Sequence, residues 1–323
     1  MDIQNIIAEI KLKMEQAGGL KAVCFVACGG SQAAIYPAKY LIDSEAKNIG
    51  TKIYNSNEFV HAAPKSLDER CICIICSLKA TAETVEAVKT ANKKGAVTIA
   101  MTGFPDTDMA KNGRYVVLYS SGDEQVYSKA NQATALKLAF EILYQFEGYQ
   151  YYQEAMEAYS HLDQIIADSK QSMLPAARKF AERYRSDEVF YVLGSGPLTG
   201  TAYTMACCHL MEMQCCHAVM LHCGEYFHGP FETTDKNLAL ILLMSTGRTR
   251  ALDERVLRFL KTYAGRFWVI DTADTGISAI DEHVAEFFDS VIMIPIERFF
   301  VSQMAELRGR SMDDRKYMWK VEY

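Results

Sequence analysis

Residues 224–232 read GEYFHGPFE and hold the side chains best suited to moving protons. The stretch carries one imidazole, His228, and two carboxylates, Glu225 and Glu232, beside a Gly-Pro pair and three aromatic residues. It is too rich in turn formers for a helix and too polar for a core strand. It is either a surface turn with a chance histidine or a loop that delivers His228 for proton transfer, because the pKa of an imidazole lies near neutrality.

Two strand-to-helix turns in the first half could bind an anion through backbone N–H groups and hydroxyls. One is CGGS, which contains Gly30 and ends in Ser31, and the other is SLKAT, with Ser77 and Thr81, followed by Thr84. Neither has the glycine pattern of a dinucleotide fingerprint or a P-loop, and either one alone would be an ordinary turn. Together, after neighbouring strands of one sheet, they favour a small phosphorylated ligand.

The composition limits the partners. The chain has 323 residues, half of them apolar, and a net charge of −6, and this length suits two domains of about 150 residues each. An acidic chain argues against nucleic acid as the main partner, because phosphate backbones bind basic surfaces. No apolar run approaches the roughly 18 to 20 residues of a membrane helix, and the charged N-terminus lacks a signal peptide's apolar centre. We expect a cytoplasmic protein that binds no membrane.

Ten cysteines raise the question of a metal site. Cys73 and Cys76 have CxxC spacing, but they lie in CICIICS, an apolar run in which free cysteine acts as a small hydrophobic residue. No second CxxC follows, and the pairs Cys207–Cys208 and Cys215–Cys216 lack the spacing of a ligand set. We expect the cysteines to be reduced thiols, because thiols stay reduced in the cytosol. We predict no metal and no cofactor.

Hydrophobic patterning predicts short apolar strands that alternate with helices. The expected strands are AVCFVACGG (22–30), CICIICS (71–77), AVTIAMTG (96–103), YVVLYSS (115–121), VFYVLGSGP (189–197), LALILLMST (238–246), FWVIDT (267–272) and SVIMIPI (290–296). Pro37 should distort the helix after the first strand, and residues 127–147 should form a long helix. Such strands predict parallel sheets covered on both faces. We therefore predict an α/β protein of two similar domains, residues 1–160 and 161–323, with ligands at the carboxyl ends of the strands.

The chain resembles the tandem sugar-isomerase (SIS) family, and within it the fructosamine-6-phosphate deglycases that act on fructoselysine and glucoselysine 6-phosphates. It is similar, more distantly, to the isomerase half of glucosamine–fructose-6-phosphate aminotransferase. The likeness runs nearly end to end, and its most specific parts are FVACGGS (25–31), LMEMQ (210–214), GEYFHGPFE (224–232) and RKYMWKVEY (315–323). The resemblance implies two flavodoxin-like SIS domains.

The resemblance also implies roles for individual residues. Glu212, sixteen positions before His228, corresponds to the family's base. His228 handles protons on sugar oxygens and can come from the neighbouring subunit, and Lys320 corresponds to the family's C-terminal lysine. Glu225 and Gly229 would shape the loop around His228. A homodimer or larger homo-oligomer with shared active sites is implied.

The phosphate-binding turns depart from the family in one place. Ser31, Ser77 and Thr81 inherit the phosphate-binding role, but the family's second turn usually reads S-x-S-G-x-T, whereas this chain has SLKAT, one residue shorter. We expect Lys79 to supply a charge in place of the missing donors, because lysine commonly binds phosphate. The alternative is weaker phosphate binding, in a degenerate enzyme or a sensor.

These residues would release an amine from a ketosamine 6-phosphate without a cofactor. The C2 carbonyl of the open sugar acidifies the C1 protons, so Glu212 could remove one to give a 1,2-enaminol. Reprotonation at C2 gives an imine, which water hydrolyses to glucose 6-phosphate and the amine. His228 would open the ring, and Lys320 would stabilise developing negative charge. An apolar pocket around Glu212 would make it a better base.

Each role has a plainer rival. Glu212 could pair with an arginine, His228 could bond its own turn, and Lys320 could be surface charge. The competing functions are aldose–ketose isomerisation, ammonia-dependent formation of glucosamine 6-phosphate, and non-catalytic sugar-phosphate sensing. Residue 1 leads almost directly into the first SIS unit, so we expect neither a glutaminase domain nor a helix-turn-helix before it. The identity of the released amine stays open.

Overall fold

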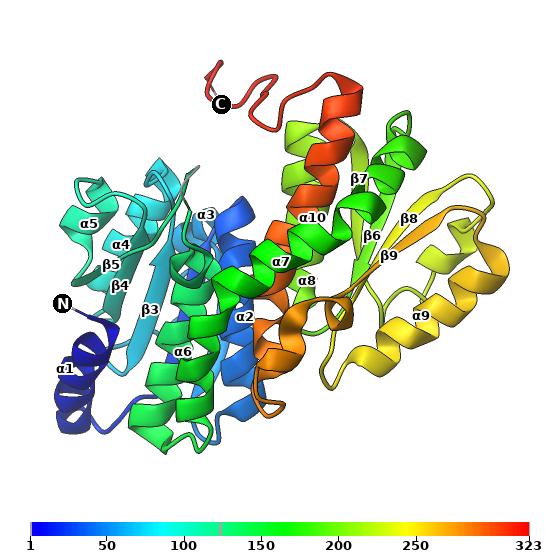
Figure 1. The fold of residues 1–323 in the computed structure, drawn as a ribbon. Coiled ribbons are helices and arrows are strands. Elements are labelled where there is room, and N and C mark those ends of the chain that lie inside the picture. The colour runs from blue at the N-terminus through cyan, green and yellow to red at the C-terminus, as the bar shows by residue number, and fades with distance from the viewer. Residues whose placement is uncertain (1, 123–124, 323) are drawn as a thin grey trace. The chain divides into compact units, whose positions relative to one another are not determined.

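The computed structural model describes residues 2–122 and 125–322. The chain divides into two compact units, Met1–Ser160 and His161–Tyr323. Each unit is built around one parallel sheet with helices on both of its faces (Figure 1), so the predicted α/β fold class is confirmed. Helix α7 (Tyr152–Tyr184) runs across the boundary between the units.

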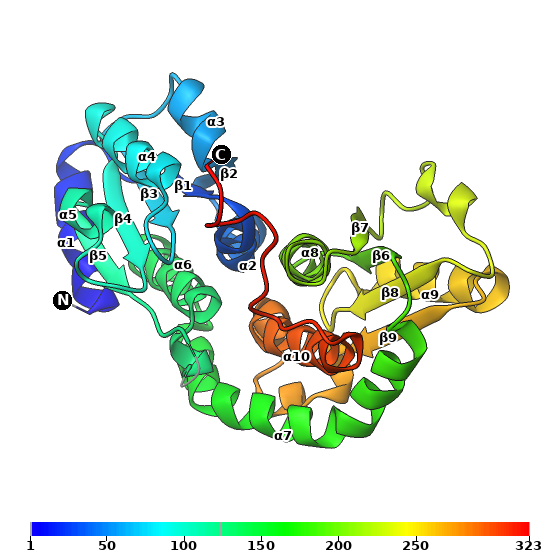
Figure 2. The same ribbon diagram turned by 90° about the horizontal axis from the view of Figure 1, so that it is seen from above.

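The first unit contains a five-stranded sheet in the order β2-β1-β3-β4-β5, and every neighbouring pair is parallel. This is the flavodoxin-like strand order. The strands are β1 (Ala22–Ala27), β2 (Gly50–Asn55), β3 (Cys71–Cys76), β4 (Val97–Thr102) and β5 (Tyr115–Leu118). The helices are α1 (Ile3–Gln16), α2 (Gly29–Glu45), α3 (Ser56–His61), α4 (Ala82–Lys93), α5 (Asp108–Asn112), the short η1 (Tyr127–Lys129) and α6 (Asn131–Glu147). Helices α1, α2 and α6 pack together on one face, and α3, α4 and α5 on the other (Figure 2).

The predicted strands of this unit are present, with two differences at the level of residues. The glycines after β1 do not end the strand but begin α2, which continues through Pro37 to Glu45. Strand β2 was not predicted, because it is an edge strand whose side chains are half-exposed and whose sequence, GTKIYN, has no continuous apolar run. The central strands β3 and β4 are buried along their whole length, which explains their uniformly apolar sequences.

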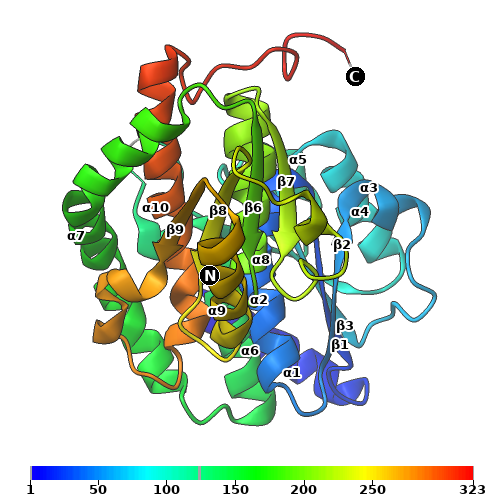
Figure 3. The same ribbon diagram turned by 90° about the vertical axis from the view of Figure 1, so that its right-hand side faces the viewer.

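The second unit repeats the first four positions of this sheet, in the order β7-β6-β8-β9 (Figure 3). Its strands are β6 (Val189–Gly194), β7 (His217–His222), β8 (Ala239–Met244) and β9 (Phe267–Asp271). Its helices are α8 (Leu198–Tyr203), the π-helix η2 (Thr204–Met213), the short η3 (Pro230–Thr233), α9 (Arg250–Tyr263), the short η4 (Thr272–Asp274) and η5 (Gly276–Ala279), and α10 (Ala285–Arg308). Helices α8, η2 and α10 pack on one face of the sheet and α9 on the other (Figure 2).

One predicted strand is wrong. Residues 290–296 belong to α10. Almost every residue from Phe287 to Glu297 is buried, so this helix is apolar on all sides and lacks the amphipathic period that separates a helix from a buried strand. Pro295 lies inside the helix without ending it.

The described residues give two further findings that bear on function. Among them, no helix is long and apolar enough to cross a membrane. In residues 2–122 and 125–322, no three His, Cys, Asp or Glu side chains are grouped so as to hold a metal ion. The ten cysteines are free thiols; Cys71 and Cys73 lie in the hydrophobic core together with Cys24.

Candidate active site

The two predicted phosphate-binding turns lie side by side in the first unit. Strands β1 and β3 are neighbours, and their last residues, Ala27 and Cys76, are paired in register. Ser31 lies in the first turn of α2, directly after β1, and Ser77 follows the last residue of β3. Both turns therefore meet at the carboxyl edge of the sheet, where parallel α/β sheets bind their ligands.

The hydroxyls of the second turn have different surroundings. Ser77 Oγ accepts a hydrogen bond from the N–H of Thr81 at 3.2 Å, and Thr81 is exposed. Thr84 is only 1% exposed, and its hydroxyl donates to Ser56 Oγ at 3.0 Å and contacts Thr81 Oγ1 at 3.0 Å. The structure therefore makes Thr84 a support for Thr81 and Ser56, and a direct contact between Thr84 and phosphate stays a prediction.

The SLKAT turn carries backbone strain. Ala80 has a φ of +55°, a left-handed conformation that disfavours any residue with a Cβ. Lys79, at the preceding position, is exposed. The strained position is thus Ala80, next to Lys79, and a glycine would adopt its conformation more easily.

Ser31 lies next to a buried thiol. The thiol of Cys76 lies close to the hydroxyls of Ser31 and Tyr119. Burial raises the pKa of Cys76 to about 12, and the two nearby hydroxyls act in the opposite direction. The neighbour of Ser31 is thus a neutral thiol at physiological pH, and it adds no negative charge to a site that would hold phosphate. Gly30, next to Ser31, is exposed.

Glu212 lies near the end of η2 and is paired with an arginine. Nε of Arg315 is 2.6 Å from Oε1 of Glu212, and the two side chains are 9% and 22% exposed. The Nε–H makes no aligned hydrogen bond, so the contact is chiefly electrostatic. The guanidinium also lies over the ring of Trp319, 5.6 Å from its centre. The carboxylate of Glu212 thus lies against a cation rather than in an apolar pocket, and the arginine pairing considered as its alternative role is present.

Arg315 belongs to a C-terminal segment, residues 310–322, that is docked on the end of η2. Arg310 Nε donates to the carbonyl of Met213 at 2.6 Å, and Gln214 Nε2 donates to the carbonyl of Arg310 at 3.3 Å. Lys320 lies five residues beyond Arg315, is exposed, and donates its backbone N–H to Tyr317. The segment is thus fixed beside Glu212, with Lys320 on its accessible part.

His228 lies in an exposed turn that is shaped by the backbone of its neighbours. Its N–H donates to the carbonyl of Glu225 at 2.9 Å. Gly229 has a φ of +127°, which only glycine adopts without strain. The side chain of Glu225 is exposed, so its contribution in this structure comes from its backbone.

The loop around His228 is anchored on α9. Tyr226 is fully buried in a cluster that includes Val256 and Leu260 of α9. Phe227 and Phe231 both contact the ring of Phe259. The guanidinium of Arg255 lies over Phe227, 4.1 Å from the ring centre. These contacts hold the loop on the α9 face of the sheet and leave His228 at its exposed tip.

The structure does not bring Glu212 and His228 together within one chain. Glu212 precedes β7 and His228 follows it, and a six-residue strand spans roughly 16 Å between its ends. Moreover, η2 lies on one face of the sheet, whereas the His228 loop packs on α9 at the other face (Figure 2).

Two features of this unit were not predicted from the sequence. One is Arg315, whose only signal was a basic residue beside aromatic ones near the chain end. The other is a buried pair in which Nδ1 of His209, on η2, lies 2.8 Å from a carboxylate oxygen of Glu297, on α10. Burial raises the pKa of Glu297, and His209 opposes that shift. Polar residues inside otherwise apolar helices were the signal for this pair.

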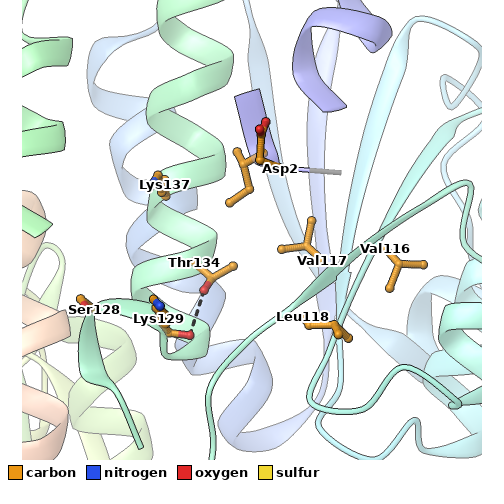
Figure 4. A pocket seen from close by; sticks show the side chains of 9 residues that line it. Asp2, Val116, Val117, Leu118, Ser128, Lys129, Thr134 and Lys137 are labelled. Carbon is orange, nitrogen blue, oxygen red and sulfur yellow. Dashed lines mark hydrogen bonds between the residues drawn. The ribbon is translucent and has the colours of Figure 1, made fainter. Parts of the chain in front are cut away.

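A cavity of about 530 Å³ in the first unit contains none of the predicted site residues (Figure 4). It lies beside β5 and the start of α6, and its lining includes Val117, Leu118, Lys129, Thr134 and Lys137. The hydroxyl of Thr134 donates to the carbonyl of Lys129 at 3.2 Å, so this hydroxyl proton is engaged within the wall of the cavity.

Known proteins resemble the whole chain. A family model described as SIS domain matches residues 20–142. The chain is 36% identical over 323 residues to fructosamine deglycase FrlB of Bacillus subtilis (strain 168). This alignment covers 100% of this chain and 97% of that protein. It is 22% identical over 296 residues to fructoselysine 6-phosphate deglycase of Escherichia coli (strain K12), covering 91% and 84% of the two chains.

A crystal structure of a Bacillus subtilis protein matches this fold with a TM-score of 0.95 and 36% identity, over 99% of this chain and 97% of that one. Together with the full-length identity to a fructosamine deglycase, this match confirms the resemblance inferred from the sequence motifs. The chain belongs to the SIS-domain sugar-isomerase family that includes the fructosamine deglycases.

Proposed function

We propose that this protein is a deglycase that releases glucose 6-phosphate and a free amine from a ketosamine 6-phosphate. The observation that carries the proposal is the 36% identity to a fructosamine deglycase along the whole chain. The fructoselysine 6-phosphate deglycase among its relatives supports a phosphorylated sugar-amine as the substrate class. Fructoselysine and glucoselysine 6-phosphates are the first candidates.

In this proposal Glu212 is the base that removes the C1 proton. Its carboxylate is partly exposed and held beside Arg315. The guanidinium at this distance offers a positive charge near the developing enaminol oxygen. Lys320, on the same docked segment, would add a second cation. The 1,2-enaminol is then reprotonated at C2, and water hydrolyses the resulting imine.

Phosphate binding is assigned to the paired turns after β1 and β3. Ser31, Ser77 and Thr81 offer hydroxyls, Gly30 offers a backbone N–H, and Lys79 offers a charge. Support comes from the adjacency of the two turns at the carboxyl edge of the sheet and from the exposure of Gly30, Lys79 and Thr81.

We further propose a cytoplasmic homodimer or larger homo-oligomer in which His228 acts in the neighbouring subunit's site. The support is the separation of Glu212 and His228 within one chain, by the length of β7 and by the sheet itself. An imidazole at the exposed tip of an anchored loop is placed to reach a partner rather than its own base.

A coupled dehydrogenase assay that follows glucose 6-phosphate tests the reaction. Fructoselysine 6-phosphate, glucoselysine 6-phosphate and fructose 6-phosphate, the last with and without ammonia, are compared as substrates. Glu212→Gln should lower turnover about 10²- to 10⁴-fold, the usual contribution of a general base, while glucose 6-phosphate still binds. Glu306→Gln, an exposed glutamate on α10, is the matched control and should leave turnover unchanged.

The pattern of substrates separates the candidate functions. Release from a ketosamine that depends on Glu212 establishes deglycation. Conversion of fructose 6-phosphate alone indicates an isomerase. Tight binding of glucose 6-phosphate with no turnover of any of these compounds indicates a sensor, and the strained SLKAT turn would then be the first place to look for the cause.

A further inference from the structure

The second unit has its own copy of the turn assigned to phosphate in the first. Strands β3 and β8 occupy the same place in their sheets, next to β1 and β6. After β3 the chain reads SLKAT (77–81) and enters α4, and after β8 it reads STGRT (245–249) and enters α9. Both turns have five residues, with a serine first and a threonine last.

In the second unit, carboxyl groups of the same chain accept hydrogen bonds from the N–H groups of the STGRT turn. Three backbone N–H groups of this turn donate to three carboxyl groups. These bonds run from Ser245 to Asp253 at 2.9 Å, from Thr246 to Asp289 at 2.7 Å, and from Arg248 to Glu286 at 3.0 Å. The hydroxyl of Thr246 also donates to Asp289 at 2.6 Å. Asp253 and Asp289 are fully buried and Glu286 is 8% exposed.

Glu286 lies where an external anion would lie. A Cβ built on Gly247 would come within 2.0 Å of Glu286 Oε2, so only glycine lets the carboxylate approach the backbone this closely. Nη2 of Arg248 is 2.5 Å from Oε1 of the same carboxylate. A glycine, a backbone N–H and a guanidinium are the usual parts of a phosphate site. Here all three hold a side chain of the same chain.

The first unit lacks the side chains that fill this turn. The carboxyl groups of Glu286 and Asp289 come from the start of α10, which packs on η2 and α8 as α6 packs on α2. In α6, whose residues are all described, the first turn holds no acidic residue, and its first acid is Glu141. Asp253, four residues after Thr249, is matched by Val85, four residues after Thr81.

We infer that the STGRT turn is a phosphate-type anion site occupied by the chain's own Glu286, which closes it to sugar phosphates. Each chain then binds phosphate through its first unit alone. This inference rests on the proposed function, because that function assigns phosphate to the corresponding turn of the first unit. It explains how two copies of one α/β unit come to have different roles.

Calorimetric titration with glucose 6-phosphate and with inorganic phosphate tests whether the STGRT turn is closed to phosphate. The wild-type protein should bind one equivalent per chain. Thr81→Ala should weaken binding about tenfold, as expected for one hydrogen bond to a charged group, and Arg248→Ala should leave the Kd unchanged. A comparable loss of affinity in Arg248→Ala would overturn the inference, because the second unit would then hold the phosphate.

A second variant tests the role of Glu286 directly. Glu286→Ala should open a second, weaker phosphate site, and adding Arg248→Ala should remove it. A folded Glu286→Ala protein that still binds one equivalent would refute Glu286 as the occupant. Should this variant fail to fold, the titration of Arg248→Ala still decides whether the turn is closed.

These outcomes are separate from failure of the proposed function. If neither Thr81→Ala nor Arg248→Ala changes the affinity, the second turn is closed as inferred, but the phosphate assignment in the first unit is wrong. Turnover of ketosamine 6-phosphates and its loss in Glu212→Gln are measured independently of both titrations.

Discussion

Mixing two inactive variants should restore activity if His228 completes the site of a neighbouring subunit. Within one chain the ends of β7 are roughly 16 Å apart, far beyond the reach of a hydrogen bond of about 3 Å. In a heterodimer of Glu212→Gln and His228→Ala chains, one site has both intact residues and the other has neither. Random pairing makes half of the dimers mixed, so the mixture should reach about a quarter of wild-type activity, as two-fold symmetry requires.

The assay is release of glucose 6-phosphate after the two variants, carrying different tags, are co-expressed and the mixed species is purified through both tags. The purified mixed dimer should show about half of the wild-type activity per dimer, because one of its two sites is intact. Glu212→Gln paired with Glu212→Ala is the control and should stay inactive. Activity in the mixed species no higher than the sum of the parents would refute the shared site and require that Glu212 and His228 act within one chain.

Three further predictions concern strain, protonation and the docked segment. Ala80→Gly should raise the free energy of unfolding by about 0.5 to 1 kcal/mol in urea denaturation, because the relieved left-handed strain exceeds the entropic penalty of glycine; a loss of stability would contradict it. Burial raises the pKa of Asp289 to about 8 against the lowering effect of its hydrogen bonds with Thr246. The folded state therefore holds a proton that the unfolded state has lost between pH 4 and 8. Stability should fall with rising pH in that window by up to about 1.4 kcal/mol per pH unit, and Asp289→Asn should flatten this slope. Arg315→Ala should speed hydrogen exchange in residues 311–322 while the exchange of α9 stays unchanged, because the ion pair with Glu212 helps to dock that segment; equal exchange in both proteins would show that Arg310 docks it alone.

The alternation of apolar strands and helices was readable because the central strands are buried on both faces. Strands β1, β3, β4 and β8 were predicted for that reason, and the same rule failed at residues 290–296, since a fully buried helix carries an equally uniform apolar sequence. Edge strand β2 escaped prediction because half-exposed strands tolerate polar residues. Half-exposed edge strands β5 and β9 were still predicted, because their sequences YVVL and FWVI are continuous apolar runs.

Some features of the candidate site were likewise predictable from the sequence, and others were not. The motifs GEYFHGPFE and LMEMQ identified His228 and Glu212, and the order of the strands placed Ser31 and Ser77 on neighbouring turns. The pattern could not show that Thr84 turns inward to Ser56, because a hydroxyl at the start of a helix looks the same whether it faces solvent or the core. Nor could it show which acid fills the STGRT turn, since Glu286 lies about forty residues further along the chain.

The sequence by itself determined the α/β class and the two similar units, because hydrophobic period and local turn chemistry are encoded in short stretches, and its motifs named Glu212 and His228 as candidates for proton transfer. Only the tertiary structure decided that Arg315 lies against Glu212, that β7 and the sheet separate Glu212 from His228, and that Glu286 fills the STGRT turn. Each of these depends on contacts between residues far apart in the chain, and such contacts leave no period or spacing in the sequence.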